Sequence, residues 1–314
     1  MSDPSIAKEE LLRQLLPTVE TALNRHQTAA VEWFPHDYVP YERGRNYIEE
    51  PWVPSDSDLP DMAKTALEVN LLTEDNLPYY QLALWRTFGN DEAWGDWVRQ
   101  WTAEEGRHAI AIRDYLTVTR GLDPAVLDRG RMDMALRGWY PNFAEIGPVD
   151  GVVFTTIQEL ATRISHRNTG MITDDPGAER LCARIATDEN LHYVFYRDLA
   201  AATIQVDPSA VMLAIKRQVT NFQMPGVDMP GFADKAKQMA RAGVYNVRIH
   251  VEQVLRPILE KHWRLGEIEG LTDEAKQARE DIFHHLDRLE RIATRLGESL
   301  GPVRVDISSD PVGD

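Results

Sequence analysis

Two copies of one short motif, a glutamate followed three residues later by a histidine, constrain the fold of this chain more than any other feature. Glu105 and His108 form the first copy, and Glu189 and His192 form the second, 84 positions later. Residues three apart lie on one face of an α-helix, about 5–6 Å apart, so each pair can bind the same ion. The repeat therefore predicts two helices that each offer one carboxylate and one imidazole.

A single glutamate precedes each motif at nearly the same distance. Glu74 lies 31 residues before Glu105, and Glu159 lies 30 residues before Glu189. Glu159 is the only acidic residue in the segment 151–173, whereas a solvated glutamate normally has charged neighbours. Two lone glutamates and two Glu-x-x-His motifs on four helices make up a di-iron carboxylate site. The alternative is that these side chains form surface pairs with lysine or arginine at helical spacing.

The donor atoms of this set indicate which metal it would bind. Carboxylate oxygen and imidazole nitrogen without thiolate suit iron or manganese, whereas a structural zinc site would favour cysteine. Four carboxylates balance the charge of two divalent cations, which allows such a cluster to lie in the dry core of a helical bundle. We therefore predict a site for two metal ions with six ligands: Glu74, Glu105, His108, Glu159, Glu189 and His192.

Composition narrows the class of protein. The 314 residues include 34 Lys and Arg against 50 Asp and Glu, a formal charge of −16, which argues against a general nucleic-acid binder. The single cysteine, Cys182, excludes an internal disulfide framework and fits a reducing cytosol. The first residues do not resemble a signal peptide, and no run of 18 apolar residues occurs. We therefore expect a cytoplasmic protein without a membrane span.

Helical periodicity recurs along the chain, and no convincing strand pattern appears. We predict an all-α protein with one helical domain at 1–300 and a disordered tail at 301–314. The proline-rich segment 33–60 should wrap the surface or cover another part of the fold.

Two prolines should perturb their helices. Pro17 should kink or break a helix over 6–25. Pro78 should bend a helix over 61–88 beside Glu74, because proline cannot donate to the carbonyl of Glu74.

Several longer stretches resemble the soluble acyl-acyl carrier protein desaturases, the stearoyl type of plastids and its actinobacterial relatives. The matching stretches are TEDNLPYYQ at 73–81, WTAEEGRH at 101–108, IQELATRISHRNTG at 157–170, ATDENLH at 186–192, and HDYVP after Trp33. The resemblance covers roughly residues 33–222. It implies a ferritin-like four-helix bundle with flanking helices, usually a homodimer, in which the six ligands hold two iron ions. It also implies an oxygen-dependent enzyme that introduces a cis double bond into a fatty acyl chain on acyl carrier protein, in fatty acid biosynthesis.

The reaction that the resemblance implies needs two electrons from outside the chain. The sequence has no Gly-x-Gly-x-x-Gly motif for flavin or nicotinamide, so an external ferredoxin is the expected donor. Asp188 could accept the second ring N–H of His108. In the family such an Asp, with a Trp matching Trp33, is suggested to form the electron route. The alternative for Trp33 is a plain core aromatic.

Three other residues near the motifs have expected roles. Thr162 follows Glu159 by three residues, so its hydroxyl could bond dioxygen or pass a proton, or simply bond a backbone carbonyl. We expect His166 to be a hydrogen-bonded structural residue rather than a seventh ligand. Cys182 should be a small core residue without a redox role.

The sequence also indicates where a substrate and protein partners would bind. A long acyl chain needs a narrow apolar channel, which we expect between 77–84 and 151–157, with Trp85 and Arg86 at its end. The segment 208–251 carries a local excess of basic residues that could dock an acidic carrier protein or ferredoxin, or be scattered solvated charges. Its basic residues are Lys216, Arg217, Lys235, Lys237, Arg241 and Arg248, against Asp228 and Asp234.

Two other functions remain open at this point. A related di-iron oxygenase or hydroxylase acting on another substrate would share all six ligands. A non-enzymatic ferritin-like metal-binding protein would share the bundle, although ferritin subunits are much shorter than this chain.

Overall fold

The structure is a computed structural model that describes residues 7–223, 227 and 231–301, and this part of the chain contains helices and no strand. The all-α prediction is therefore confirmed. The α-helices are α1 (Lys8–Ala29), α2 (Asp61–Glu74), α3 (Leu77–Phe88), α4 (Glu92–Val118), α5 (Pro124–Arg137), α6 (Phe143–Ile146), α7 (Pro148–Met171), α8 (Pro176–Val206), α9 (Pro208–Thr220), α10 (Phe232–Arg241), α11 (Val247–Ile249) and α12 (Asp273–Leu296). Short 3-10 segments lie at η1 (Pro35–Asp37), η2 (Tyr41–Arg43), η3 (Pro54–Asp56) and η6 (Leu265–Glu267), and π-helical turns at η4 (His250–Leu255) and η5 (Pro257–His262).

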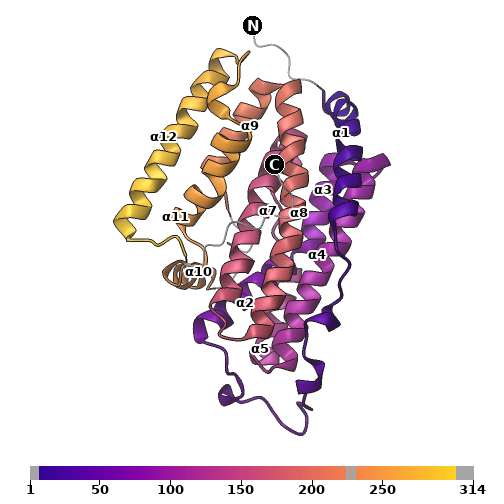
Figure 1. Ribbon diagram of the computed structural model, residues 1–314, viewed down its shortest axis with the longest axis vertical. Helices are drawn as coiled ribbons and strands as arrows, with labels where there is room; N and C mark the ends of the chain where they lie inside the picture. Colours follow the sequence, from indigo (N-terminus) through magenta and orange to yellow (C-terminus); the bar gives the residue numbers. More distant parts are fainter. Residues whose placement is uncertain (1–6, 224–226, 228–230, 302–314) are drawn as a thin grey trace.

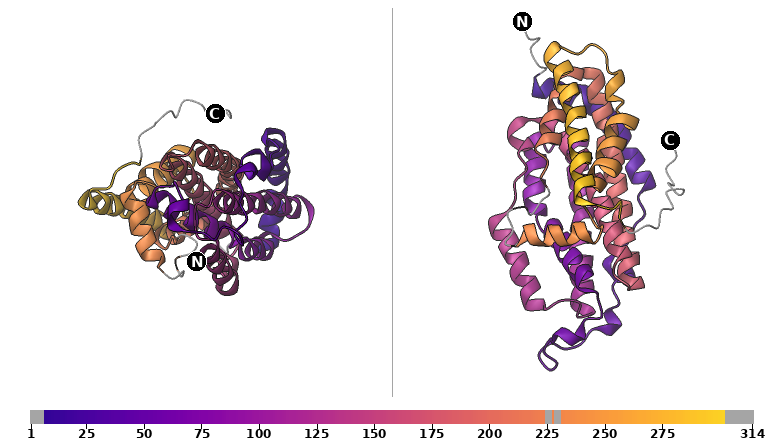
Figure 2. Two further views of the ribbon diagram at one scale, coloured as in Figure 1. Left: turned by 90° about the horizontal axis from the view of Figure 1, so that it is seen from below. Right: turned by 90° about the vertical axis from the view of Figure 1, so that its left-hand side faces the viewer.

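Helices α2, α4, α7 and α8 form the centre of the bundle, and α7 and α8 lie side by side along most of their length (Figure 1). Helix α1 packs on α8 and α4, whereas α9 and α12 pack together on the other side. Helix α10 runs across the long axis of the molecule (Figure 2). At Gly170 of α7 an added Cβ atom would lie 2.9 Å from the Cβ atom of Cys182 on α8. Glycine therefore allows the close approach of these two helices there, and Cys182 is buried in the core.

Helix starts follow ordinary capping chemistry. Pro148, Pro176 and Pro208 each stand in the first turn of a helix, where the missing proline N–H has no helical partner to lose. Asp175 caps α8 by accepting from the backbone N–H groups of Gly177 and Ala178. These residues thereby set where the long helices begin.

The helix over 6–25 was predicted to kink or break at Pro17, and it is not broken. Helix α1 continues through Pro17. Leu11 and Leu15 are buried before the proline, and Val19 and Leu23 are buried after it. Each fully buried leucine or valine stabilises the fold by about 1.5–3 kcal/mol, which together outweighs the cost of about 3 kcal/mol for an interior proline. Packing against the bundle therefore holds the helix together.

The single helix predicted over 61–88 is in fact two helices. Helix α2 ends at Glu74, and α3 begins at Leu77, so that Pro78 stands in the first turn of α3 rather than inside a bent helix. The turn between them is fixed by Asn76, whose side chain donates to the carbonyl of Trp139 and accepts from its N–H at 2.8 and 2.7 Å. Glu74 is therefore the last residue of its helix.

The irregular segment 33–60 runs along one end of the bundle (Figure 1). Arg120, which is 2% exposed, holds it by donating to Asp56 and to the carbonyl of Glu50, both at 2.8 Å. None of the helices in the described ranges has the length and apolar character to cross a membrane. The single domain at 1–300 stays a prediction, and the tail predicted at 301–314 lies, apart from Gly301, outside the described residues.

Candidate metal centre

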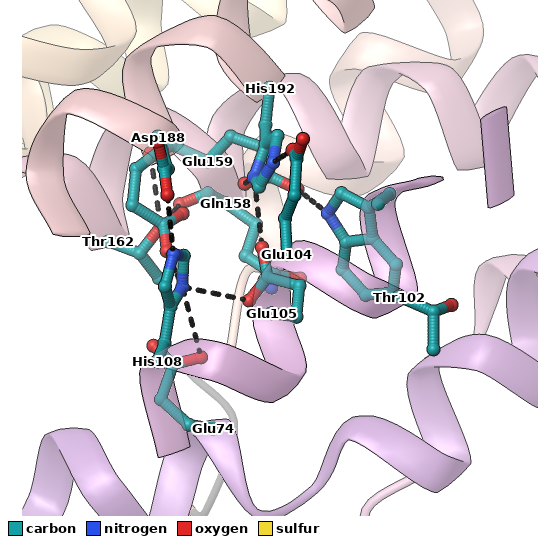
Figure 3. Close-up of polar contacts among 12 residues, drawn as sticks. Glu74, Thr102, Glu104, Glu105, His108, Gln158, Glu159, Thr162, Asp188 and His192 are labelled. Atoms are coloured by element: carbon teal, nitrogen blue, oxygen red, sulfur yellow. Dashed lines mark hydrogen bonds and ion pairs between the residues drawn. The ribbon is translucent and has the colours of Figure 1, made fainter. Parts of the chain in front are cut away.

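The six side chains predicted as ligands converge in one buried region between α2, α4, α7 and α8. Figure 3 labels five of them, all except Glu189. Their donor atoms form two groups, each with all atoms within 4.8 Å of one another. The groups share Glu105 and Glu189. The first group is Glu74, Glu105, His108 and Glu189, and the second is Glu105, Glu159, Glu189 and His192.

The atoms that face one another in this cluster include buried donors and acceptors without a normal hydrogen bond. Within the described part of the chain, these are Nδ1 of His108 and His192 and Oε1 of Glu105 and Glu189. Oε1 of Glu105 lies 2.9 Å from Nδ1 of His192, and Oε1 of Glu189 lies 3.2 Å from Nδ1 of His108. Buried polar atoms are costly without partners. Metal cations that bind oxygen and nitrogen would give all four atoms a partner, so the residues present fit a pair of metal ions.

The charges of the cluster also favour cations. Burial, together with the charges of Glu189 and Glu105, raises the pKa of Glu159 well above its usual range, although a hydrogen bond with His192 partly opposes this. For His108, burial alone would lower the pKa, but Asp188 and Glu105 raise it well above the usual range. A dry site with four carboxylates therefore needs positive charge, which protons or metal ions can supply.

Asp188 contacts His108 as predicted, with 3.3 Å between Oδ2 and Nε2. The same oxygen accepts a hydrogen bond of 2.7 Å from Nε1 of Trp33, and two arginines, Arg107 and Arg184, pair with this carboxylate. Burial would raise the pKa of Asp188, but the contact with His108 and the charge of Arg184 lower it to about 2. The contacts that an electron route would use are thus in place, and the route itself stays a prediction.

Thr162 lies against the cluster with its hydroxyl 2.7 Å from Oε2 of Glu189. The carbonyls of Gln158 and Glu159 also lie within 3.2 Å of it. The backbone contact given as the alternative for Thr162 therefore exists, and the role with dioxygen or a proton stays a prediction.

Glu104, the acidic partner of His192, was not predicted from the sequence. Its Oε2 lies 2.8 Å from Nε2 of His192, and its carboxylate also binds His26 of α1. Burial would raise the pKa of Glu104, but the hydrogen bonds from His192 and His26 lower it far below its usual range. A signal was available, since Glu104 precedes Glu105 as Asp188 precedes Glu189. No sequence signal marks His26, because only packing brings α1 to the site.

Two further contacts were not anticipated. Trp101 donates from Nε1 to Oε1 of Glu159 at 3.0 Å. Nε2 of His166 lies 2.8 Å from Oε1 of Glu74, and its other ring nitrogen faces the amide of Asn70. His166 is thus hydrogen-bonded to a predicted ligand, in line with the structural role expected for it.

A cavity of about 70 Å³ lies between α2, α7 and α10. Its lining includes Thr162 and His166 on α7 and the apolar side chains of Val69, Phe232 and Met239. Thr162 therefore borders both this cavity and the carboxylate of Glu189.

The predicted channel end at Trp85 and Arg86 is wrong. Both residues are exposed, Trp85 by 38%, and the guanidinium of Arg86 lies over the ring of Tyr140. Helix α3 buries Leu84 and Phe88 instead, which turns positions 85 and 86 to the outer face of the helix.

The basic residues predicted as a docking face are largely neutralised by acidic residues. Five of the six form ion pairs, some with acids from distant segments, which the local charge count could not show. The pairs are Lys216–Asp281, Arg217–Asp150, Lys235–Glu68, Lys237–Asp234 and Arg248–Glu252.

Comparisons with known proteins identify the family of this chain. The sequence model of the family described as fatty acid desaturase matches residues 7–306. DesA1 of Mycobacterium tuberculosis, named as an acyl-[acyl-carrier-protein] desaturase, is 45% identical over 90% of this chain and 86% of its own length. The chloroplastic stearoyl-[acyl-carrier-protein] 9-desaturase 6 of Arabidopsis thaliana is 29% identical over 91% of this chain and 76% of its own length. The X-ray structure of DesA2 of M. tuberculosis H37Rv superposes with a TM-score of 0.69 at 28% identity, covering 86% of this chain and 99% of that one. The predicted ferritin-like fold and oxidoreductase class are thereby confirmed, and the chain belongs to the fatty acid desaturase family.

Proposed function

We propose that this protein is an oxygen-dependent desaturase that introduces a cis double bond into a fatty acyl chain carried on acyl carrier protein, with two iron ions per chain. The observation that carries the proposal is the buried convergence of four carboxylates and two imidazoles whose unpartnered atoms face one another. The names of DesA1 and the Arabidopsis enzyme support acyl carrier protein as the substrate carrier.

The six predicted residues would hold the ions: Glu74, Glu105, His108, Glu159, Glu189 and His192. When bound, iron supplies the activation of dioxygen that removal of hydrogen from unactivated methylenes requires. The reaction consumes dioxygen, two protons and two electrons, takes two hydrogens from the acyl chain, and yields the alkene and two waters. We infer that ferredoxin delivers the electrons.

The chain's own residues would position the substrate and move protons. The cavity under α10 supports an acyl path next to Thr162, whose hydroxyl lies between the cavity and Glu189 and can hold or hand on a proton at Oγ1. Its volume of about 70 Å³ accommodates only a short stretch of an acyl chain, so the chain would extend beyond it. Trp33 and Asp188 would connect His108 to the irregular segment 33–60, where an electron donor could dock.

We further propose a homodimer. Met132 and Leu136, one turn apart on α5, are exposed by 64% and 78%, which supports a contact with a second copy of the chain. Light scattering on the purified protein tests the oligomeric state, and a mass of 35.7 kDa would contradict the dimer.

Product analysis tests the activity. Iron-loaded protein is supplied with reduced ferredoxin, dioxygen and acyl carrier proteins that bear acyl chains of graded length, and the released acids are analysed by mass spectrometry. An alkene is the expected product, and the matching coenzyme A thioesters show whether the carrier is required. A hydroxylated acid would instead indicate a related oxygenase, and iron oxidation without organic product would indicate a metal-binding protein.

A further inference from the structure

Glu104 lies buried between two histidines from different helices. Glu104 is 4% exposed. Its carboxylate lies 2.8 Å from Nε2 of His192 on α8 and 3.0 Å from Nε2 of His26 on α1. A carboxylate only accepts hydrogen bonds, so both histidines donate to it through Nε2. This arrangement leaves Nδ1 of His192 as the nitrogen that faces Glu105 and Glu159, at 2.9 and 3.5 Å.

The ring of His26 is itself fixed on several sides. It is 3% exposed, stacks on the ring of His192 at 5.7 Å between centroids, and meets the edge of Trp97 at 5.0 Å. Its Nδ1 is buried without a hydrogen-bond partner among the described residues, beside a cavity of about 10 Å³. That volume is near the lower limit for one water molecule. His26 is thus a rigid donor that keeps the Glu104 carboxylate in place.

The equivalent carboxylate in the other half of the site has a different environment. Asp188 faces two arginines, Arg107 and Arg184, which neutralise much of its charge. Glu104 has no lysine or arginine partner in the described residues, and its remaining neighbour is the neutral amide of Gln100 at 2.5 Å. The negative charge behind His192 is therefore less compensated than the charge behind His108, which favours a cation on the His192 side.

We propose that Glu104 and His26 are positioning residues for the metal ion that His192 binds: they hold the imidazole by Nε2 so that Nδ1 points at that ion. The proposal rests on the metal-binding function proposed above. It makes α1, which lies outside the four central helices, part of the support of the site. Outer partners of ligand histidines typically change metal affinity by about 10–100-fold.

The test is an anaerobic titration of the metal-free full-length protein with Fe²⁺ and, separately, with Co²⁺. The number of metal ions per chain is measured by elemental mass spectrometry after gel filtration. The visible absorption of Co²⁺ reports the ligand geometry. The variants are Glu104→Ala and His26→Ala, with His26→Gln as the conservative partner, since its amide can still donate to Glu104. Thr102→Val is the matched control on α4, because its hydroxyl bonds the Val98 carbonyl and points away from the cluster (Figure 3).

Wild type and Thr102→Val should bind two ions. Glu104→Ala and His26→Ala should bind one of the two ions about 10–100-fold more weakly with an altered Co²⁺ spectrum, and His26→Gln should recover much of the loss.

If circular dichroism shows that Glu104→Ala does not fold, the two His26 variants decide alone. Wild-type affinity and spectrum in folded His26→Ala would overturn the positioning role. A third ion in wild type that is lost in His26→Ala would also overturn it, since these residues would then be ligands. Fewer than two ions in wild type would instead refute the proposed metal centre, and the positioning role with it.

Discussion

Glu104 and Asp188 occupy equivalent positions in the two halves of the site. Each precedes a predicted ligand glutamate by one residue, and each lies against the histidine of the other half, at 2.8 and 3.3 Å. Glu104 of α4 therefore contacts His192 of α8, and Asp188 of α8 contacts His108 of α4. The surroundings break this symmetry, because Asp188 also contacts Trp33 and two arginines whereas Glu104 contacts His26.

Metal binding should release protons. Burial and the neighbouring carboxylates hold the pKa of Glu159 well above its usual range, which favours the protonated form of this carboxyl in the metal-free protein, and an incoming cation must displace that proton. Affinity should therefore rise with pH and fall on acidification, by about tenfold per pH unit for each proton released. Adding Fe²⁺ anaerobically to weakly buffered protein with a pH indicator measures the release. Glu159→Gln should release fewer protons and bind fewer ions, and a wild-type titration without acidification would contradict the assignment.

Thr162→Val should slow alkene formation while leaving the metal content unchanged. The hydroxyl lies 2.7 Å from Glu189 and borders the cavity, and a hydrogen bond to a charged group contributes about 1.5–3 kcal/mol. A loss of about 10–100-fold in kcat is expected, with recovery in Thr162→Ser. Thr156→Val is the matched control, because that buried hydroxyl on the same helix bonds the Val152 carbonyl at 2.7 Å. Equal effects of the two valine variants would show that Thr162 has only a structural role.

Trp33→Phe and Asp188→Asn should slow electron entry. Phenylalanine keeps an aromatic ring but removes the N–H that donates to Asp188 at 2.7 Å. We expect reduction of the iron-loaded protein by reduced ferredoxin to slow by about 10–100-fold, as followed by stopped-flow absorbance. Trp52→Phe, which removes a hydrogen bond to the carbonyl of Arg120 in the same irregular segment, should keep the wild-type rate. If Trp33→Phe is also reduced at the wild-type rate, Trp33 is a core aromatic only.

Arg217 should matter for stability rather than for partner docking. It pairs with Asp150, which is 2% exposed, so Arg217→Ala leaves a buried carboxylate with one remaining partner, Gln218. The free energy of unfolding should fall by about 1–3 kcal/mol in urea titrations. Lys216→Ala removes a solvent-exposed pair with Asp281 and should cost at most about 1 kcal/mol. Asp150→Asn should recover part of the loss in Arg217→Ala, and equal stability of the two alanine variants would contradict this account.

Local sequence rules predicted much of the fold and the core of the site. The prolines and capping aspartates set the starts of α7, α8 and α9, and the three-residue spacing placed Glu105 with His108 and Glu189 with His192 on single helix faces. Such features depend on neighbours within one helical turn, so they can be read without a structure. The isolation of Glu159 in an uncharged helix indicated burial for the same reason.

Packing decided the rest, because it depends on residues far apart in the chain. It kept α1 continuous through Pro17, and it brought His26 to Glu104 across 78 positions. It turned Trp85 and Arg86 outward, and it paired three basic residues of 208–251, Lys216, Arg217 and Lys235, with acids from other helices. The sequence by itself determined which residues could bind metal, since helical spacing is local. Only the tertiary structure decided which side chains support them, because those partners come together only when the helices pack.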